Sequence, residues 1–188
     1  MSPILSQPTA RLHLASPWGP LMALATADAL CGVYFEDQDD FPDLQGIPDR
    51  SAPVLERFAQ RFDHYLAGAP VIFDLPLAAG GTAFQRAVWE ELARCPHGVT
   101  WTYGALAQRI GRPKAVRAVG QAVGRNPWII VVPCHRVLAA GGTLGGFSAG
   151  LPRKRSLLAL EGVQVAADPQ MALLPAGAGG SCDRIGMA

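Results

Sequence analysis

One cysteine of this 188-residue chain stands in a segment whose residue types could support nucleophilic chemistry. Cys134 follows a proline, and His135 and Arg136 come directly after it. A thiol attacks as its thiolate, and a neighbouring base or positive charge lowers the pKa that governs ionisation. The apolar run 129–132 predicts a buried strand that ends at this cysteine. Neighbours in a strand point to opposite faces, and buried cysteines are commonly inert, so packing is the favoured interpretation from these residues alone.

The remaining cysteines, Cys31, Cys95 and Cys182, form no C-x-x-C pair, and cysteines and histidines are not clustered. We therefore expect no metal site. The first residues lack the basic start and apolar core of a secretory signal, which favours reduced thiols and a cytoplasmic location. No apolar run approaches the ~18 residues of a membrane span, so we expect no membrane partner.

The elements expected just before the cysteine are two short helices, over residues 103–110 and 114–124, with Thr102 as the N-cap of the first. A three-residue turn that contains Gly111 and Pro113 joins them, which is the layout of a DNA-binding helix-turn-helix. An ordinary helical hairpin has the same layout, and these residues leave both interpretations open. The side chains expected to face the core from the second helix are Val116, Val119 and Val123.

Positive charge gathers in this part of the chain. Residues 80–165 hold eleven Lys and Arg against three Glu, whereas residues 1–79 hold four Arg against ten Asp and Glu. A basic half of this kind indicates a surface for a polyanion, although a solvated basic face is the common alternative. The basic residues that would meet phosphates are Arg109, Arg112, Lys114, Arg117 and Arg125. The other side chains expected on the outer face of the second helix are Ala118 and Gln121.

The first half of the chain is predicted to be a small sheet with one helix. Residues 10–36 alternate apolar and polar side chains, which predicts about three short antiparallel strands. An acidic, proline-rich loop follows at 37–53, then a helix over 52–66, and residues 71–75 are predicted as one more strand. The apolar stripe of this helix consists of Leu55, Phe58, Phe62, Tyr65 and Leu66.

The second half is predicted to be mostly helical. Thr82 is expected to cap a helix over 84–94, and a last helix is expected over 152–160, beyond a glycine-rich loop. The charge changes sign near Gly80-Gly81, which marks a boundary. We therefore expect an α+β fold. Its parts are an N-terminal scaffold domain at 1–79, a DNA-binding and catalytic domain at 80–165 and a disordered tail at 166–188.

A resemblance to a known family gives these features a function. Pro133-Cys134-His135-Arg136-Val137 matches the active-site motif of the O6-alkylguanine-DNA alkyltransferases, also called methylated-DNA–protein-cysteine methyltransferases. The resemblance is specific over residues 82–163, and looser in the first half through Ser16–Pro20 and Leu30–Phe35. The further motifs that fall in family order and spacing are Phe84–Trp89, Pro96-His97-Gly98, Thr102-Tyr103, Arg117–Gly120, Asn126-Pro127 and Leu157–Gly162.

The resemblance implies a catalytic role for five residues. Cys134 would accept an alkyl group from O6 of a damaged guanine and keep it. His135 would deprotonate the thiol through a bridging water, and Glu161 would orient and polarise the imidazole. Tyr103 would donate a proton toward guanine N3. Asn126 would hold the turn that links the recognition helix to the active-site strand.

The resemblance also implies the partner and the binding residues. The partner would be double-stranded DNA that carries an alkylated guanine, and Arg117 would fill the base stack after the guanine is flipped out. The DNA-binding residues would be Arg117, Lys114, Ala118, Gln121, Arg125 and Arg112, and the pocket residues Tyr103, Val137 and Ser148. We expect a monomer that needs no cofactor, acts once per molecule and accepts alkylguanine, with O4-alkylthymine as an open question.

Three other functions fit parts of the sequence. A non-catalytic lesion-binding relative would lack the motif cysteine, so Cys134 argues against it. A helix-turn-helix transcription factor would bind a sequence regardless of damage. A cysteine hydrolase that uses Cys134 and His135 would turn over repeatedly. Gln121 and Phe147 depart from common family residues, which leaves the preferred alkyl group open.

Overall fold

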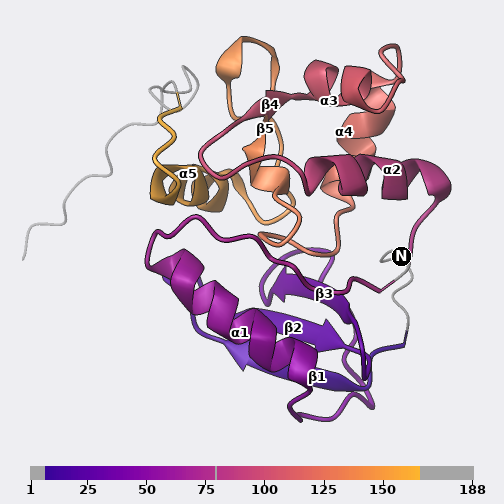
Figure 1. The fold of residues 1–188 in the computed structure, drawn as a ribbon, viewed down its shortest axis with the longest axis vertical. Helices are drawn as coiled ribbons and strands as arrows, with labels where there is room; N and C mark the ends of the chain where they lie inside the picture. Colours follow the sequence, from indigo (N-terminus) through magenta and orange to yellow (C-terminus); the bar gives the residue numbers. More distant parts are fainter. Residues whose placement is uncertain (1–6, 79, 166–188) are drawn as a thin grey trace, which may run out of the picture.

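The computed structural model describes residues 7–78 and 80–165, and the expected tail at 166–188 lies outside this part. Strands and one helix make up the first half, and helices dominate the second half (Figure 1). The α+β expectation is therefore confirmed. No helix in the described part of the chain is long and apolar enough to cross a membrane.

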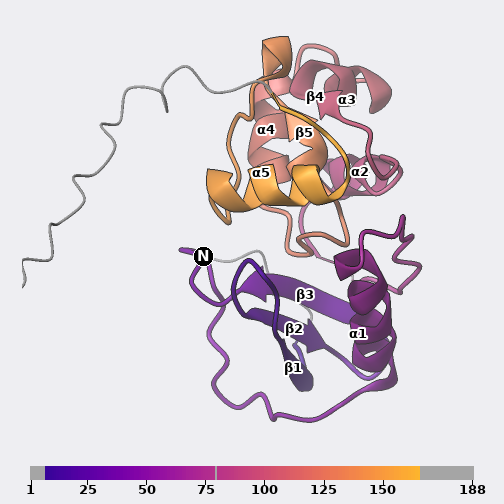
Figure 2. The ribbon, with the colours of Figure 1, turned by 90° about the vertical axis from the view of Figure 1, so that its left-hand side faces the viewer.

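The sheet of the first half has three antiparallel strands in chain order, as predicted. They are β1 (Ala10–Leu14), β2 (Leu21–Ala25) and β3 (Leu30–Phe35). The helix α1 (Pro53–Leu66) packs its apolar stripe against one face of the sheet (Figure 2). Side chains of the 41–47 loop cover the other face, and for this reason β2 and β3 are buried along their whole length.

The predicted strand at 71–75 is wrong. This segment is extended, but the guanidinium groups of Arg57 and Arg61 donate to the carbonyls of Asp74 and Ile72. Those carbonyls are thus satisfied by α1 side chains instead of a neighbouring strand. Beyond this segment, the backbone joins the sheet at Leu77, which forms a bridge with Leu30.

The second half is built from four helices and a short parallel strand pair. The helices are α2 (Ala83–Leu92), α3 (Tyr103–Arg109), α4 (Val116–Gly124) and α5 (Leu151–Leu160). The strands are β4 (Trp101–Thr102) and β5 (Val137–Leu138). Thr82 and Thr102 cap α2 and α3 as expected, each by accepting a hydrogen bond from a backbone N–H of the first turn. Helix α4 begins two residues later than predicted, and Val116 is 40% exposed instead of buried.

The predicted strand at 129–132 is also wrong. These residues form a buried turn in which Ile130 has a φ of 71°. The turn forms because the side-chain amide of Asn126 donates to the carbonyls of Trp128 and Val132 and accepts from the N–H of Trp128. Cys134 therefore opens a single 3-10 turn, Cys134–Arg136, and does not end a strand.

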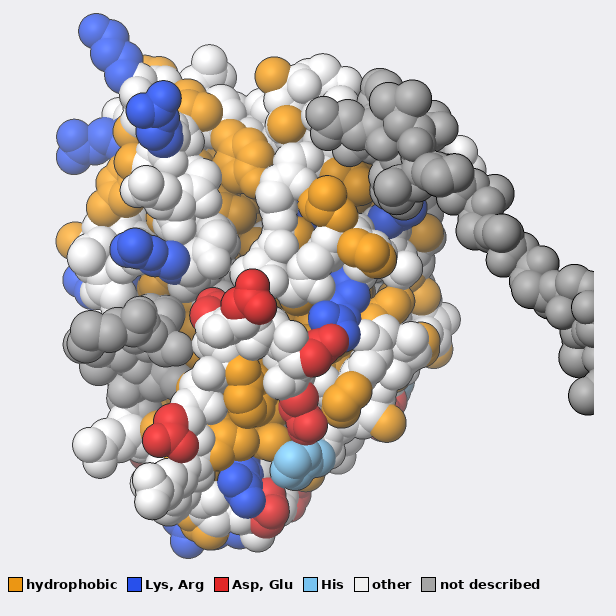
Figure 3. Space-filling view, turned by 180° about the vertical axis from the view of Figure 1, so that it is seen from behind, with side chains coloured by type: hydrophobic (Ala, Val, Ile, Leu, Met, Phe, Trp, Pro, Cys, Tyr) orange, Lys and Arg blue, Asp and Glu red, His pale blue; other side chains and the backbone are white. Residues whose placement is uncertain are grey.

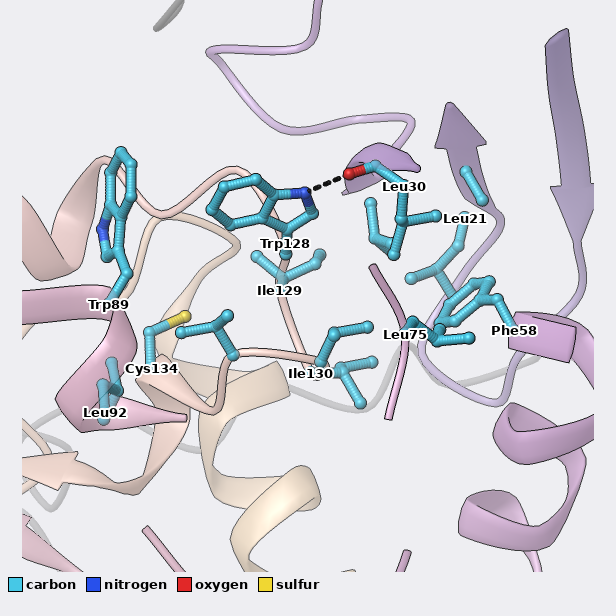
Figure 4. Close-up of a cluster of buried hydrophobic side chains, with 14 of the residues drawn as sticks. Leu21, Leu30, Phe58, Leu75, Trp89, Leu92, Trp128, Ile129, Ile130 and Cys134 are labelled. Carbon is cyan, nitrogen blue, oxygen red and sulfur yellow. Dashed lines mark hydrogen bonds between the residues drawn. The ribbon is translucent and has the colours of Figure 1, made fainter. Parts of the chain in front are cut away.

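This turn also joins the two halves. The Trp128 indole packs edge-on against Trp89, with ring centroids 5.5 Å apart, and its Nε1 donates to the carbonyl of Leu30 at 2.8 Å (Figure 4). The backbone of Val33 in β3 bonds to Pro127 and Ile129. Cys134 thus follows a segment that is fixed from both halves.

Candidate active site

The Cys134 thiol is buried, with 2% of the residue exposed, beside the amide of Asn126. Asn126 Nδ2 lies 3.2 Å from Cys134 Sγ and donates to it. Burial raises the pKa of the thiol, while the Asn126 hydrogen bond and the charge of Lys154 oppose that rise. These two groups stabilise the thiolate once it forms.

His135 is fully buried and pairs with Glu161. The distance from His135 Nε2 to Glu161 Oε1 is 2.8 Å, and His135 Nδ1 is buried with no partner among the described residues. Burial lowers the pKa of His135, against the opposing effect of Glu161, so the resting imidazole is neutral. A neutral ring facing a carboxylate carries its proton on Nε2, which leaves Nδ1 as an acceptor.

Glu161 is surrounded by donors. Arg136 donates from Nε to Oε2 at 2.8 Å and from Nη2 to Oε1 at 2.9 Å, and the Tyr65 hydroxyl donates to Oε1 at 2.8 Å. The Gly98 N–H, at a φ of +72° that favours glycine, donates to Oε2 at 3.2 Å. Burial alone would raise the pKa of Glu161, but the hydrogen bonds and charges of His135 and Arg136 outweigh it and lower that pKa. The carboxylate is therefore ionised.

A small cavity of about 120 Å³ lies in front of the cysteine. Of the residues expected at the site, it brings together Cys134, Tyr103 and Ser148. The rest of the lining comes from Gly120, Val123 and Gly124 of helix α4 and from the loop 146–148. Val137, expected in the pocket, is fully buried in β5 and is not among the residues that line this cavity.

Lys154, which was not predicted, bonds to the loop that lines the cavity. It is fully buried, and its Nζ donates to the carbonyls of Val137, Leu144 and Gly146. Burial lowers the pKa of this lysine to about 8, with the charge of Cys134 acting in the opposite direction. No local pattern predicts its burial, because a lysine between two arginines is typical of a solvated helix face.

The expected DNA-binding residues gather on the exposed side of the α3–α4 hairpin. All six of these residues are exposed, namely Arg112, Lys114, Arg117, Ala118, Gln121 and Arg125. Figure 3 shows Lys and Arg side chains at the end of the molecule that the second half forms, and acidic side chains over the first half. Arg109, which was also expected to meet phosphates, is engaged by side chains of the protein itself. It pairs with Glu91 at 2.6 Å and stacks over the Trp101 ring at 4.1 Å.

Comparisons with known proteins agree on one family. Residues 83–163 match the 6-O-methylguanine DNA methyltransferase, DNA binding domain, and residues 13–79 match the ribonuclease-like domain of the same family. Two relatives are named methylated-DNA–protein-cysteine methyltransferase. The Haemophilus influenzae protein is 42% identical over 79% of this chain and 84% of its own length. The Shigella flexneri protein is 50% identical over 79% of this chain and 93% of its own length.

A solved structure agrees with this assignment. The crystal structure of Mycobacterium tuberculosis OGT in complex with DNA is 40% identical, with a TM-score of 0.76. The match covers 81% of this chain and 93% of that one. With both halves matched in order and a buried motif cysteine beside a His–Glu pair, the chain belongs to the 6-O-methylguanine DNA methyltransferase family.

Proposed function

We propose that this protein repairs alkylated DNA by moving the alkyl group of an O6-alkylguanine onto Sγ of Cys134. The observation that carries the proposal is the position of the thiol. Cys134 lines a small cavity together with three residues of α4, the helix that carries exposed Arg117. A base turned out of the duplex beside α4 would therefore meet the sulfur.

The thiol is activated by a proton relay. Its proton passes through a bridging water to His135 Nδ1, the buried nitrogen that has no partner among the described residues. Glu161 then faces an imidazolium and offsets its charge. The Asn126 amide, which already donates to Sγ, stabilises the thiolate left behind.

The transfer is a displacement at the alkyl carbon. A sulfur–carbon bond forms as the carbon–O6 bond breaks, and the bonding pair leaves with the guanine. Tyr103, on the cavity wall, donates a proton to guanine N3 so that the base departs neutral. The proton taken up by His135 balances the one that Tyr103 gives. Because a thioether is a poor leaving group, the protein stops after one transfer.

The exposed face of the α3–α4 hairpin binds the DNA. Arg112, Lys114 and Arg125 contact phosphates, while Arg117 fills the space that the flipped guanine leaves. Ala118 and Gln121 lie between them on α4 and approach the groove. Residues 80–165 would then be the DNA-binding and catalytic domain, with 1–79 as its scaffold. The monomeric state, the cytoplasmic location and the range of alkyl groups stay predictions.

Intact-mass measurement after exposure to excess DNA with O6-methylguanine tests the proposal. We expect one added methyl group per molecule, none on Cys134→Ala, and an unchanged result on Cys31→Ala, a matched loss of a buried thiol in the first half. A methyl group on Cys134→Ala, or more than one per wild-type molecule, contradicts the proposed acceptor. Release of several product molecules per protein would instead support a hydrolase.

The role of Arg117 has its own test. Arg117→Ala should slow repair more than it weakens binding to undamaged duplex. The flipped-out state would lose the side chain that fills the base stack, and with it a stabilisation of a few kcal/mol, of the order of the unstacking cost of one base step. Arg112→Ala is the control for a phosphate contact and should weaken both duplexes alike. Equal losses for Arg117→Ala on damaged and undamaged DNA would make Arg117 a phosphate contact too.

A further inference from the structure

The first half of the chain contributes one polar group to the buried relay. The Tyr65 hydroxyl, on α1, lies 2.8 Å from Glu161 Oε1, and both residues are buried. Among the described residues, the other side chains that bond to Glu161 belong to the 3-10 turn Cys134–Arg136, namely His135 and Arg136. Tyr65 is 96 positions away in the sequence, so only the packing of the two halves brings it here.

The tyrosine ring is held on several sides. Its centroid lies 6.5 Å from that of Trp18, 6.0 Å from that of Phe73 and 6.2 Å from that of His97, the last in an edge-to-face arrangement. An ionised carboxylate only accepts hydrogen bonds, so the hydroxyl is the donor. The packing therefore fixes one donor at one oxygen.

That oxygen is the one that faces the imidazole. Glu161 Oε1 accepts from Tyr65 and from His135 Nε2, in addition to Arg136 Nη2. Donation from the hydroxyl withdraws negative charge from Oε1 and fixes the rotation of the carboxylate. The proton shared with His135 then stays on the imidazole, and the ring keeps the orientation in which Nδ1 is the accepting nitrogen.

We propose that Tyr65 is a positioning residue for alkyl transfer, through which the first half completes the Glu161–His135 relay. The inference rests on the proposed function, since it assigns Tyr65 to the relay that activates Cys134. It gives the first half a role in the reaction in addition to its role as a scaffold. Tyr65 acts through Glu161 and touches neither the thiol nor the cavity in front of it.

Tyr65→Phe tests the inference, because it removes the hydroxyl and keeps the ring. We expect the second-order rate constant of methyl transfer to fall about tenfold, which corresponds to about 1.4 kcal/mol of barrier. Tyr34→Phe is the matched control. Tyr34 is equally buried in the same half, and its hydroxyl has no hydrogen-bond partner among the described residues. That control should transfer at the wild-type rate.

The pH dependence separates positioning from packing. With Tyr65 gone, more charge remains on Glu161 Oε1, which raises the pKa of the His135 imidazolium. The acid limb of the rate profile, where His135 must be neutral, should therefore move to higher pH in Tyr65→Phe. A packing defect would lower the melting temperature and leave the limb in place. If melting is lowered, the profile is measured at a lower temperature for both tyrosine variants.

A double variant completes the test. In a His135→Ala background the relay is already broken, so adding Tyr65→Phe should not lower the rate of methyl transfer any further. A wild-type rate and acid limb in Tyr65→Phe, or an equal loss with and without His135, would overturn the inference. Neither result touches the proposed function, which the intact-mass measurement on wild-type protein and Cys134→Ala tests separately.

Discussion

Replacing Glu161 by glutamine should strongly destabilise the fold, and the structure gives the size of the effect. Oε1 accepts from Tyr65, His135 and Arg136, and Oε2 accepts from Arg136 and Gly98. Glutamine has one carbonyl oxygen and one amide nitrogen that only donates. Even with the oxygen at the Oε1 position, two donors face the amide and lose their acceptor.

The charge adds to this loss, because Arg136 is only 6% exposed and would keep no anionic partner within the Glu161 cluster. Breaking a buried pair in this way costs about 3–5 kcal/mol, and two unsatisfied donors at about 1–3 kcal/mol each give a similar figure. A domain has only about 5–15 kcal/mol of stability in total, so Glu161→Gln should be marginally folded at neutral pH.

Urea unfolding of wild-type and Glu161→Gln proteins over a range of pH measures the effect. The pKa of Glu161 is lowered in the folded state, so its contribution is fully present above the unfolded value of about 4.3 and is lost as pH falls below it. The difference between the two proteins should therefore shrink in acid. Asp49→Asn, at an exposed ion pair with Arg11, is the control and should change little. A difference below about 1 kcal/mol at neutral pH, or one that does not vary with pH, would refute the reasoning.

Three further predictions concern the walls of the cavity. Arg153 donates to the carbonyl of Ala149 and, at 2.8 Å, to Asp37, and so links the loop 146–150 to the first half. Because Arg153→Ala removes this link, it should bring the transfer rates for O6-methylguanine and O6-benzylguanine DNA closer together. Arg155→Ala is the control. An unchanged ratio of these two rates in Arg153→Ala would contradict the proposed link between the loop and the first half. The pKa of Lys154 is about 10.4 in the unfolded chain and about 8 in the folded protein, so its contribution to stability grows with pH between these values. The loss of unfolding free energy caused by Lys154→Met, measured by urea unfolding, should therefore grow over the same pH range. Alkylated Cys134 should melt below the free protein, because overpacking costs about 1–3 kcal/mol; calorimetry that shows an equal or higher melting temperature counts against this.

The sequence by itself determined the elements whose signals are local. The alternation over residues 10–36 predicted the antiparallel sheet, and Thr82 and Thr102 predicted where α2 and α3 begin. Such signals work because strand alternation and N-caps depend on residues only a few positions apart. The motif around Cys134 identified the family for the same reason, since its residues are contiguous.

Only the tertiary structure decided what depends on distant partners. The apolar run 129–132 has the composition of a strand, but the amide of Asn126 folds it into a turn. Tyr65 belongs to an ordinary apolar stripe, and only the contact between the halves makes its hydroxyl a partner of Glu161. Lys154 looks solvated in the sequence and is fully buried among three carbonyls. In each case the deciding hydrogen bond is formed by groups that local spacing cannot pair, because the fold alone determines which of them meet away from water.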